Sequence, residues 1–417
     1  MFLLFCWIFF VPLQVMKRLL LILSAAFVYQ SMAQKMARFS LDFKVSQTDF
    51  VDSIRIEWDH NQVYVPVSIG NETYRFLLDT GSGQAVVYDN TPIEGCRPIG
   101  HILSYDAIGR RDTVELVALP PMTIGTITFT GCQATMQHRA VRRKDFDGIV
   151  GFDIIAKGLN AKIDVRDSVL ILSDRKNFFE SESGFNTRYK LDYHVPHVEV
   201  SPFGNFKELA LFDTGSRQFY AINKKNYDEG IDGADGMLGV QIHCITEGRY
   251  AIGNFGAEPE GEVAFLRLDA MKWGDFLFSK VETMTTQGGS HLGADILNYG
   301  AVVFNPKRKR MKFQPYNGMD TCQVNNKTLE IAYVSDHGRP AVGIVREGSV
   351  PYQQGFRSGD IILAIDGKSV STFDAFRAFA YDRGREHLFT VIDKEGREKE
   401  VRWVRLPRLQ YKAKPQK

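Results

Sequence analysis

The sequence has almost no excess of charge of either sign. Its 417 residues include 51 lysines and arginines against 49 aspartates and glutamates, which leaves a formal net charge of +2. A balance of this kind gives no long-range attraction to nucleic acid. The basic stretch PKRKRMK, residues 306–312, lies between two strand-like segments and is interpreted as a solvated hairpin. We therefore expect no nucleic-acid partner.

Cysteine is scarce, and its spacing excludes the common zinc sites. The chain has five cysteines and no CxxC pair, and the nearest histidine pair, His194 and His197, is interpreted as structural. We therefore expect no metal site. Removal of a leader would leave an even number of cysteines, which permits disulfides without fixing their pairing: Cys96, Cys132, Cys244 and Cys322.

The motifs of several large enzyme classes are also missing. There is no GxSxG and no cysteine in a nucleophile context, which excludes the usual serine and cysteine triads. There is no P-loop, and the glycines of residues 230–239 lack the strand–helix context of a dinucleotide site. We expect no cofactor, so any catalysis has to come from other side chains.

The N-terminal apolar run is too short to span a bilayer comfortably. From Met16 the chain reads MKRLLLILSAAFVYQSMAQ, in which two cations precede an apolar run and then small residues. Residues 1–33 are therefore predicted to be a cleaved leader, with Met16 as an alternative start. This predicts a bacterial protein exported to the periplasm or the outside of the cell. A membrane-tethered scaffold is the alternative, and it requires that the leader is retained.

What the sequence does contain is one unit written twice. DTGS occurs at residues 79–82 and at 213–216, each time directly after an apolar run. Further along, DGIVGFDII (residues 147–155) is matched by GSHLGADIL (residues 289–297), and a two-stranded hairpin is expected after each. Between these landmarks lie short strands rich in β-branched and aromatic residues. The fold class is therefore predicted to be mainly β, with two duplicated β-barrel-like lobes.

Pattern changes along the chain predict the boundaries of the domains. The segment 175–190 is expected to join the two lobes, and the repeat pattern ends near residue 318. The predicted units are a leader at 1–33, an N-terminal lobe at 34–175, a C-terminal lobe at 176–318, a small α+β domain at 326–407 and a basic tail at 408–417.

Two aspartates on duplicated lobes support chemistry that one does not. A pseudo-twofold axis brings equivalent points together, and two aspartates that meet there share a proton because both cannot ionise cheaply. Asp79 and Asp213 are then a general base and a general acid for a water and a carbonyl. Six neighbouring residues are expected to support the two aspartates. The threonines are expected to bond across the axis, the glycines to leave room beneath the carboxylates, and the serines to donate to the outer carboxylate oxygens. The residues are Thr80, Gly81, Ser82, Thr214, Gly215 and Ser216.

Residues 60–316, with paired DTGS words and an apolar-apolar-Gly element after each, resemble the pepsin/retropepsin family of aspartic endopeptidases in its two-lobed, single-chain form. The resemblance implies a bilobal pepsin-like fold, Asp79 and Asp213 as catalytic residues, and a peptide or protein substrate held extended across a cleft. It also implies a hairpin flap over the cleft, for which Tyr105 and Gly109 are the candidates.

Two residues depart from the family pattern. Arg217 follows the second DTGS where a small residue is usual, and His291 replaces an apolar residue in the second apolar-apolar-Gly element. A cation beside the two aspartates would lower the carboxylate pKa values or occupy the cleft. We expect both departures to affect catalysis more than the fold.

The string GFRSGDIILAIDGKSV, residues 355–370, resembles the core of a PDZ domain, and the resemblance covers residues 326–407. It implies capture of a C-terminal peptide tail by strand addition. The candidate residues are a carboxylate loop of Arg339, Pro340, Ala341, Val342 and Gly343, an edge strand that continues through Ile344 and Val345, and Phe376 in the groove. Docking of this domain against the lobes as a spacer is the alternative.

These patterns favour an exported aspartic endopeptidase with a PDZ module for peptide-tail recognition or regulation. The alternative is a catalytically weak or inactive peptide-binding scaffold with the same fold. Both readings expect a peptide or protein partner.

Overall fold

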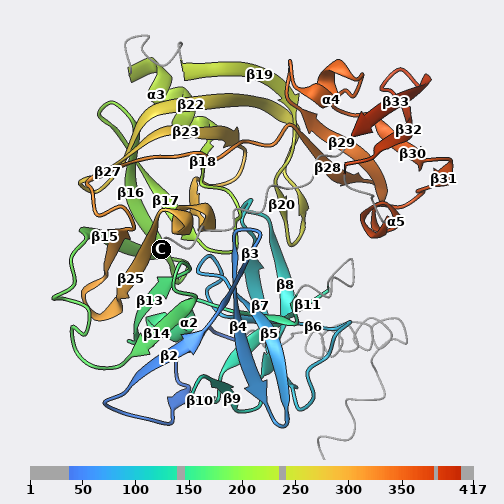
Figure 1. The fold of residues 1–417 in the computed structure, drawn as a ribbon. Coiled ribbons are helices and arrows are strands. Elements are labelled where there is room, and N and C mark those ends of the chain that lie inside the picture. The colour runs from blue at the N-terminus through green and yellow to red at the C-terminus, as the bar shows by residue number, and fades with distance from the viewer. Residues whose placement is uncertain (1–36, 139–145, 234–240, 380–383, 405–417) are drawn as a thin grey trace, which may run out of the picture.

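The computed structural model describes residues 37–138, 146–233, 241–379 and 384–404 (Figure 1). The predicted leader and basic tail therefore lie outside the described residues. Within these ranges the chain is mainly β, and none of the helices has the length and apolar character needed to cross a bilayer.

The first lobe is built on an 11-stranded sheet. Strand β5 runs antiparallel to β4 and parallel to the short β12, which in turn lies antiparallel to β6. The sheet continues through β11 and ends in the long hairpin β8–β7. In spatial order its strands are β1 (Lys44–Val45), β10 (Ile127–Thr130), β9 (Met122–Ile124), β4 (Gln62–Ile69), β5 (Glu72–Leu78), β12 (Gly148–Val150), β6 (Ala85–Tyr88), β11 (Gln133–Gln137), β8 (Arg111–Ala118) and β7 (Arg97–Tyr105), with β3 (Glu57–Asp59) paired to β4.

The second lobe repeats this arrangement strand by strand. Strand β17 is antiparallel to β16 and parallel to β24, β24 is antiparallel to β18, and β18 is parallel to β23. The series again ends in a long hairpin, β22–β19. The strands are β16 (Val195–Phe203), β17 (Phe206–Asp213), β24 (His291–Gly293), β18 (Tyr220–Asn223), β23 (Phe276–Thr286), β22 (Gly261–Trp273) and β19 (Ile242–Gly248), with α3 (Lys224–Gly233) after β18 and β27 (Thr321–Gln323) beside β23.

The β19–β22 connection carries a small hairpin of its own, β20 (Ile252–Gly253) and β21 (Gly256–Ala257). By position in the repeat, β19–β22 is the counterpart of β7–β8. The molecule therefore has two long hairpins at equivalent places.

A central group of strands joins the lobes. Each copy of the unit continues from a short helix, α2 (Asp153–Ala156) or η3 (Ala294–Asn298), into a two-stranded hairpin. The two hairpins pair with each other through β13 and β25, with Ile163 opposite Val302. The strand order is β15 (Phe185–Asp192), β26 (Arg310–Pro315), β25 (Gly300–Asn305), β13 (Asn160–Asp164), β14 (Val169–Ser173) and β2 (Val51–Arg55), and η4 (Pro306–Arg308) lies between β25 and β26.

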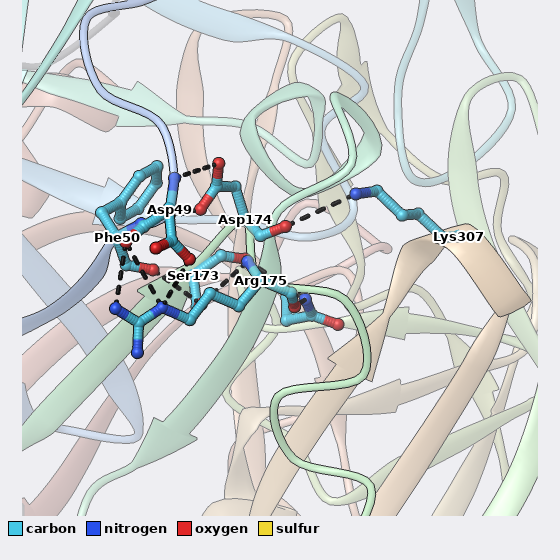
Figure 2. Close-up of polar contacts among 7 residues, drawn as sticks. Asp49, Phe50, Ser173, Asp174, Arg175 and Lys307 are labelled. Carbon is cyan, nitrogen blue, oxygen red and sulfur yellow. Dashed lines mark hydrogen bonds and ion pairs between the residues drawn. The ribbon is translucent and has the colours of Figure 1, made fainter.

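The chain leaves the first lobe through a segment held against its own N-terminal part. The Asp174 carboxylate accepts the backbone N–H groups of Asp49 and Phe50, both at 2.9 Å (Figure 2). The Arg175 side chain donates to the Asp49 carboxylate at 3.0 Å, and Lys307 donates to the Asp174 carbonyl at 3.5 Å. The expected joint at 175–190 is thus partly regular, because its second half belongs to β15.

One hydrophobic core runs through both lobes. Alternation on β4 buries Val63, Val65 and Val67 on one face, as the strand period requires. In the second lobe the aromatic residues of several strands converge, with Phe212 stacked on Trp273 at 5.8 Å between ring centroids and Trp273 close to Phe313. This continuous core fixes the two lobes relative to each other.

The C-terminal domain has a six-stranded sheet and a separate core. Phe356, Phe389 and Val401 are among its buried residues. Its elements are β28 (Ile331–Asp336), β29 (Arg339–Val345), α4 (Val350–Gln353), β30 (Ile361–Ile365), β31 (Lys368–Ser369), α5 (Phe373–Ala378), β32 (Glu386–Ile392) and β33 (Glu398–Val404), and it lies beside the second lobe (Figure 1).

Candidate active site

Each DTGS word begins where a buried strand ends. Phe76, Leu77 and Leu78 are buried on β5, and the chain then turns so that the Ser82 N–H donates to the Asp79 carbonyl at 3.2 Å. The Asp79 N–H donates to the Val150 carbonyl of the parallel strand β12 at 3.0 Å. The apolar run therefore anchors the turn and leaves Asp79 at the end of the strand.

The two turns hold each other through their threonines. The Thr80 hydroxyl donates to the Phe212 carbonyl at 2.6 Å and accepts the Thr214 N–H at 3.0 Å. Reciprocally, the Thr214 hydroxyl donates to the Leu78 carbonyl at 2.6 Å and accepts the Thr80 N–H at 3.0 Å. Both threonines are fully buried, so four hydrogen bonds satisfy six polar groups in one symmetric exchange.

This exchange brings Asp79 and Asp213 together. A Cβ placed on Gly81 would lie 2.6 Å from Oδ1 of Asp213, and one placed on Gly215 would lie 2.6 Å from a carboxylate oxygen of Asp79. Each carboxyl thus lies over the glycine of the opposite turn, in space that only a glycine leaves open. Each also accepts the N–H of the glycine in its own turn, at 2.9 Å for Asp79 and 2.8 Å for Asp213.

The pKa of Asp79 is raised well above its ordinary value. Burial is the largest cause, followed by the charge of Asp213 and a hydrogen bond between the two carboxyls. The backbone N–H groups of Gly81 and Ser82 act in the opposite direction. A proton is therefore retained on the pair at a pH where an isolated aspartate is ionised.

The expected role of the two serine hydroxyls is wrong. The Ser82 hydroxyl donates to the Gln84 carbonyl at 2.7 Å, and the Ser216 hydroxyl accepts the Gln218 N–H at 3.5 Å. It is the Ser216 backbone N–H that donates to the Asp213 carboxylate, at 3.2 Å. The tight turn aims backbone donors at the carboxylates and directs the serine side chains to the following residues.

The glycine after each apolar pair permits a close crossing. A Cβ on Gly151 would lie 2.4 Å from the backbone of Gln84, and one on Gly293 would lie 2.3 Å from the Gln218 carbonyl. The expectation that these segments pass directly beside the DTGS turns therefore agrees with the geometry.

Arg217 is hydrogen-bonded to the first lobe. Its guanidinium donates to the Gln62 side-chain oxygen, and the Gln62 amide donates to the Gly215 carbonyl at 3.2 Å. The residue before Gln62, Asn61, donates its side-chain amide to the Asp295 carboxylate at 2.9 Å. Residues 61 and 62 of the first lobe thus bind the second turn, and an effect of Arg217 on catalysis stays a prediction.

His291 is also engaged outside the pair. One ring nitrogen lies 3.1 Å from the Gln218 side-chain oxygen and the other 3.3 Å from the Gly289 carbonyl. His194 lies in the β15–β16 turn with a φ of 69°, and its ring stacks on Phe39 at 4.0 Å.

The flap candidates lie at the tip of the β7–β8 hairpin. Tyr105 is the last residue of β7, and Gly109 lies in the turn with a φ of 78°. The Tyr105 ring is 4.9 Å from that of Tyr193, which projects from the second lobe. The main-chain oxygen of Tyr193 would lie 3.2 Å from a Cβ on Gly83, next to the first DTGS turn. The hairpin tip therefore contacts a residue of the second lobe that lies beside the first DTGS turn.

Sequence reasoning missed the partner of this flap. The tip of β7–β8 contacts the β20–β21 hairpin of the second lobe, where the Phe255 N–H donates to the Asp106 carboxylate at 3.1 Å. The signal was present in the repeat, because a unit copied with its flap predicts a second hairpin at the equivalent place.

The expected carboxylate loop of the C-terminal domain is wrong, because Arg339 to Gly343 belong to a strand. Residues 339–345 form β29, which pairs with β28 along its length and with β30 at Ala341, so the expected edge strand at 343–345 stays a prediction. Their run of buried residues, typical of an interior strand, explains the difference. Phe376 packs in the domain core, 4.8 Å from the ring of Tyr333, and so does not line an open groove.

The four cysteines of the described residues are free thiols. Among the same residues no group of three or more histidine, cysteine, aspartate or glutamate side chains is placed to hold a metal ion. Among the described residues we therefore take the aspartate pair as the candidate site, because its two carboxyls can share a proton.

Comparison with known proteins gives distant structural likenesses. No family model matches the sequence, and no curated protein matches it. An aspartic proteinase from Irpex lacteus is 12% identical, with a TM-score of 0.43, and the match covers 64% of this chain and 97% of that one. Basic 7S globulin from soybean is 11% identical, with a TM-score of 0.40, and the match covers 63% and 94%.

Proposed function

We propose that the protein is an aspartic endopeptidase in which Asp79 and Asp213 activate a water for attack on a peptide bond. The observation that carries the proposal is the reciprocal threonine exchange, which places each carboxyl over the glycine of the opposite turn. A structural turn needs no such pairing, whereas acid–base catalysis by two carboxyls requires it.

The reaction follows from one proton shared by two carboxyls. The ionised carboxyl takes a proton from water as the water oxygen attacks the carbonyl carbon, and the protonated carboxyl donates to the carbonyl oxygen. Collapse of the resulting gem-diol breaks the C–N bond: the leaving nitrogen takes the proton held by the carboxyl that deprotonated the water, and the other carboxyl takes a proton from a gem-diol hydroxyl. Because the pair is symmetric, neither role belongs permanently to Asp79 or Asp213.

The two lobes and their hairpins suit an extended polypeptide substrate. The pepsin-like bilobal arrangement is part of this proposal, and its support is the strand-by-strand duplication around the aspartates. Tyr105 and Tyr193, both exposed, present aromatic surface from opposite lobes close to the first turn. We place the substrate between this surface and the aspartate pair.

The location and the C-terminal domain complete the proposal. The N-terminal segment from Met16 supports export of the protein, and sequencing of the mature N-terminus tests it. The C-terminal domain is proposed to be a PDZ-type module on the strength of its sequence pattern. Its docking on the second lobe, through Arg249 and Asp336 at 3.0 Å, supports a regulatory or spacer role.

Substitution of either aspartate tests the enzyme proposal. We expect Asp79→Asn and Asp213→Asn each to lower cleavage of a peptide library by at least about 10³-fold, since either change removes the shared proton. Cleavage by the wild type is expected to fall as pH rises through the raised pKa of the pair, because both carboxyls are then ionised. Exposed Asp167→Asn is the matched control.

Cleavage that survives in either variant contradicts the proposal. A wild type that binds a statine-type inhibitor and cleaves no member of the library would instead favour the peptide-binding scaffold. The inhibitor arm separates these outcomes, because binding requires the paired carboxyls and not turnover.

A further inference from the structure

The two long hairpins meet tip to tip. Asp106 in the β7–β8 turn accepts the Phe255 N–H at 3.1 Å, and Arg110 donates to the Phe255 carbonyl at 3.3 Å. The backbone N–H and carbonyl of one residue of the second lobe, Phe255, are therefore both bound by charged side chains of the flap. We call this contact the latch.

The flap side of the latch is rigid. The second carboxylate oxygen of Asp106 accepts the N–H groups of Ile108, at 3.2 Å, and Arg110, at 2.8 Å. The same side chain therefore shapes the flap turn and binds the opposite hairpin. A movement of the hairpin is transmitted to the turn and not absorbed by a loose side chain.

The hairpin side is anchored by a buried carboxylate at its base. Glu258, fully buried, accepts the N–H groups of Tyr250 and Ala251, the Thr286 hydroxyl and the Gln287 N–H, at 2.7–3.0 Å. Because four donors converge on one carboxylate, the hairpin projects from a fixed base towards the flap (Figure 1).

The C-terminal domain docks on the stem of the same hairpin. The Arg249 N–H donates to the Gly343 carbonyl at 2.8 Å, and its guanidinium pairs with Asp336 at 3.0 Å. Next to Arg249, Tyr250 packs in a buried cluster with Ile344 of the C-terminal domain. Two residues separate Arg249, which makes the docking contact, from β20 of the hairpin that contacts the flap.

Two glycines mark the two contacts separately. A Cβ on Gly253 would lie 2.1 Å from the Asp106 carboxylate, and its nearest neighbours are atoms of Asp106 alone. A Cβ on Gly248 would lie 2.5 Å from the Gly343 carbonyl and 3.0 Å from Ile344. Neither position has a φ in the left-handed region. Alanine at 253 therefore strains the latch, and alanine at 248 strains the docking contact.

We propose that the C-terminal domain restrains opening of the flap by holding the β20–β21 hairpin against Asp106 and Arg110. Undocking of the domain removes the contacts of Asp336, Gly343 and Ile344 with the hairpin stem. The Glu258 base stays in place, but the less restrained stem weakens the latch and lets the β7–β8 flap rise. The consequence for substrate access rests on the proposed peptidase function, whereas the mechanical coupling does not. The coupling runs through contiguous contacts from Asp336 and Ile344 to the flap tip.

Hydrogen exchange of the full chain, followed by mass spectrometry, tests the coupling. In Gly253→Ala we expect exchange of the flap peptide, residues 97–118, to rise about tenfold, the factor for loss of one charge-assisted hydrogen bond. In Gly248→Ala we expect exchange to rise both at residues 331–345 and in the flap. The exposed neighbours Asn254→Ala and Glu247→Gln are the matched controls.

A second undocking variant keeps the test decisive. Ile344→Asp places a charge in the buried docking cluster and so removes the docked domain even where Gly248→Ala is accommodated. Flap exchange that stays at the wild-type rate in both Gly248→Ala and Ile344→Asp overturns the proposal. A rise of the same size in the two control variants also overturns it.

Cleavage of an unfolded protein substrate distinguishes this inference from the proposed function. If both hold, Gly253→Ala and Gly248→Ala raise kcat/KM severalfold, because the cleft opens more often. Exchange that rises as expected without cleavage by any variant leaves the restraint standing and removes the peptidase. Cleavage with unchanged flap exchange removes the restraint alone.

Discussion

At the scale of single residues, the threonines decide where the aspartates lie. Thr80 and Thr214 each satisfy a carbonyl and an N–H of the opposite turn while fully buried. A buried polar group without a partner costs about 1–3 kcal/mol, so both turns are held strongly in this arrangement. This arrangement of the two turns fixes the positions of the Asp79 and Asp213 carboxyls.

Asp153 is a second unusual acid, outside the aspartate pair. It is 3% exposed at the start of α2, and one of its carboxylate oxygens has no hydrogen-bond partner among the described residues. Burial raises its pKa to about 7, although nearby backbone N–H groups of Ile154 and Ala85 lower it. The folded protein therefore favours the neutral acid.

This predicts a pH-dependent stability term. The pKa of an aspartate in the unfolded chain is near 3.9. Below that pH the carboxyl of Asp153 is neutral in both states and burial carries no charge penalty. As pH rises from there to about 7, the unfolded state is increasingly favoured because its carboxyl ionises first. We expect Asp153→Asn to be more stable than the wild type by about 2–4 kcal/mol at pH 8, and to lose this advantage towards pH 4. Urea denaturation across this pH range measures the difference.

Asp167→Asn, at an exposed carboxyl of the β13–β14 turn, is the control and should show no such trend. A difference between Asp153→Asn and wild type that is the same at pH 4 and pH 8 would show that Asp153 is ionised in the folded protein.

The sequence alone indicated which two aspartates meet and not the hydrogen-bond partners of the residues around them. The repeated DTGS words are enough to select Asp79 and Asp213, because the repeat implies an axis. The direction of a short side chain depends on the turn geometry, so the serine hydroxyls were assigned to the wrong acceptors. The orientation of Arg217 depends on Gln62, which is 155 residues away.

At the scale of elements, the segment between the lobes depends on one buried lysine. Lys312 on β26 is 7% exposed, and its ammonium donates to the carbonyls of Phe179, Glu180 and Glu182. The basic stretch 306–312 was expected to be a solvated hairpin, and at this position that expectation is wrong. The Lys312 side chain here supplies hydrogen bonds to three carbonyls of an irregular segment.

Lys312→Met should therefore destabilise the protein by about 2–4 kcal/mol, since three carbonyls lose a charged donor while the side-chain volume is kept. The measurement is the free energy of unfolding from urea titration. Lys309→Met, at an exposed position of the same stretch, should change it by less than about 0.5 kcal/mol. Equal losses in the two variants would contradict the role given to Lys312.

The elements were predictable where the pattern repeats and less so where it does not. The hairpins after α2 and η3 followed from the repeat, and so does the second flap, which was overlooked. A carboxylate loop was expected within β29, because strand pairing is not visible in a single apolar run. Val342 and Val345 of β29 are buried in the domain's own core, and Ile344 is buried against the second lobe.

At the scale of the whole molecule, two copies of one unit build a site that neither copy contains. The sheets of the two lobes follow the same pairing order, and the central strands β13 and β25 pair with each other. The third unit, the C-terminal domain, contacts the second lobe at Arg249 and in a buried cluster of Ile344 with Tyr250, Phe265 and Met284. The proposed peptidase activity thus belongs to the interface between the two lobes, and the proposed restraint of the flap belongs to the interface between the second lobe and the C-terminal domain.

The most direct test of this account is a carboxyl ¹³C NMR titration of Asp79, assigned with Asp79→Asn and repeated in Asp213→Asn. We predict that Asp79 in the wild type titrates well above the ordinary aspartate range and that its midpoint falls in Asp213→Asn, because a neighbouring negative charge is removed while burial remains. An ordinary midpoint in the wild type, or one unmoved by Asp213→Asn, would show that the two acids do not share a proton.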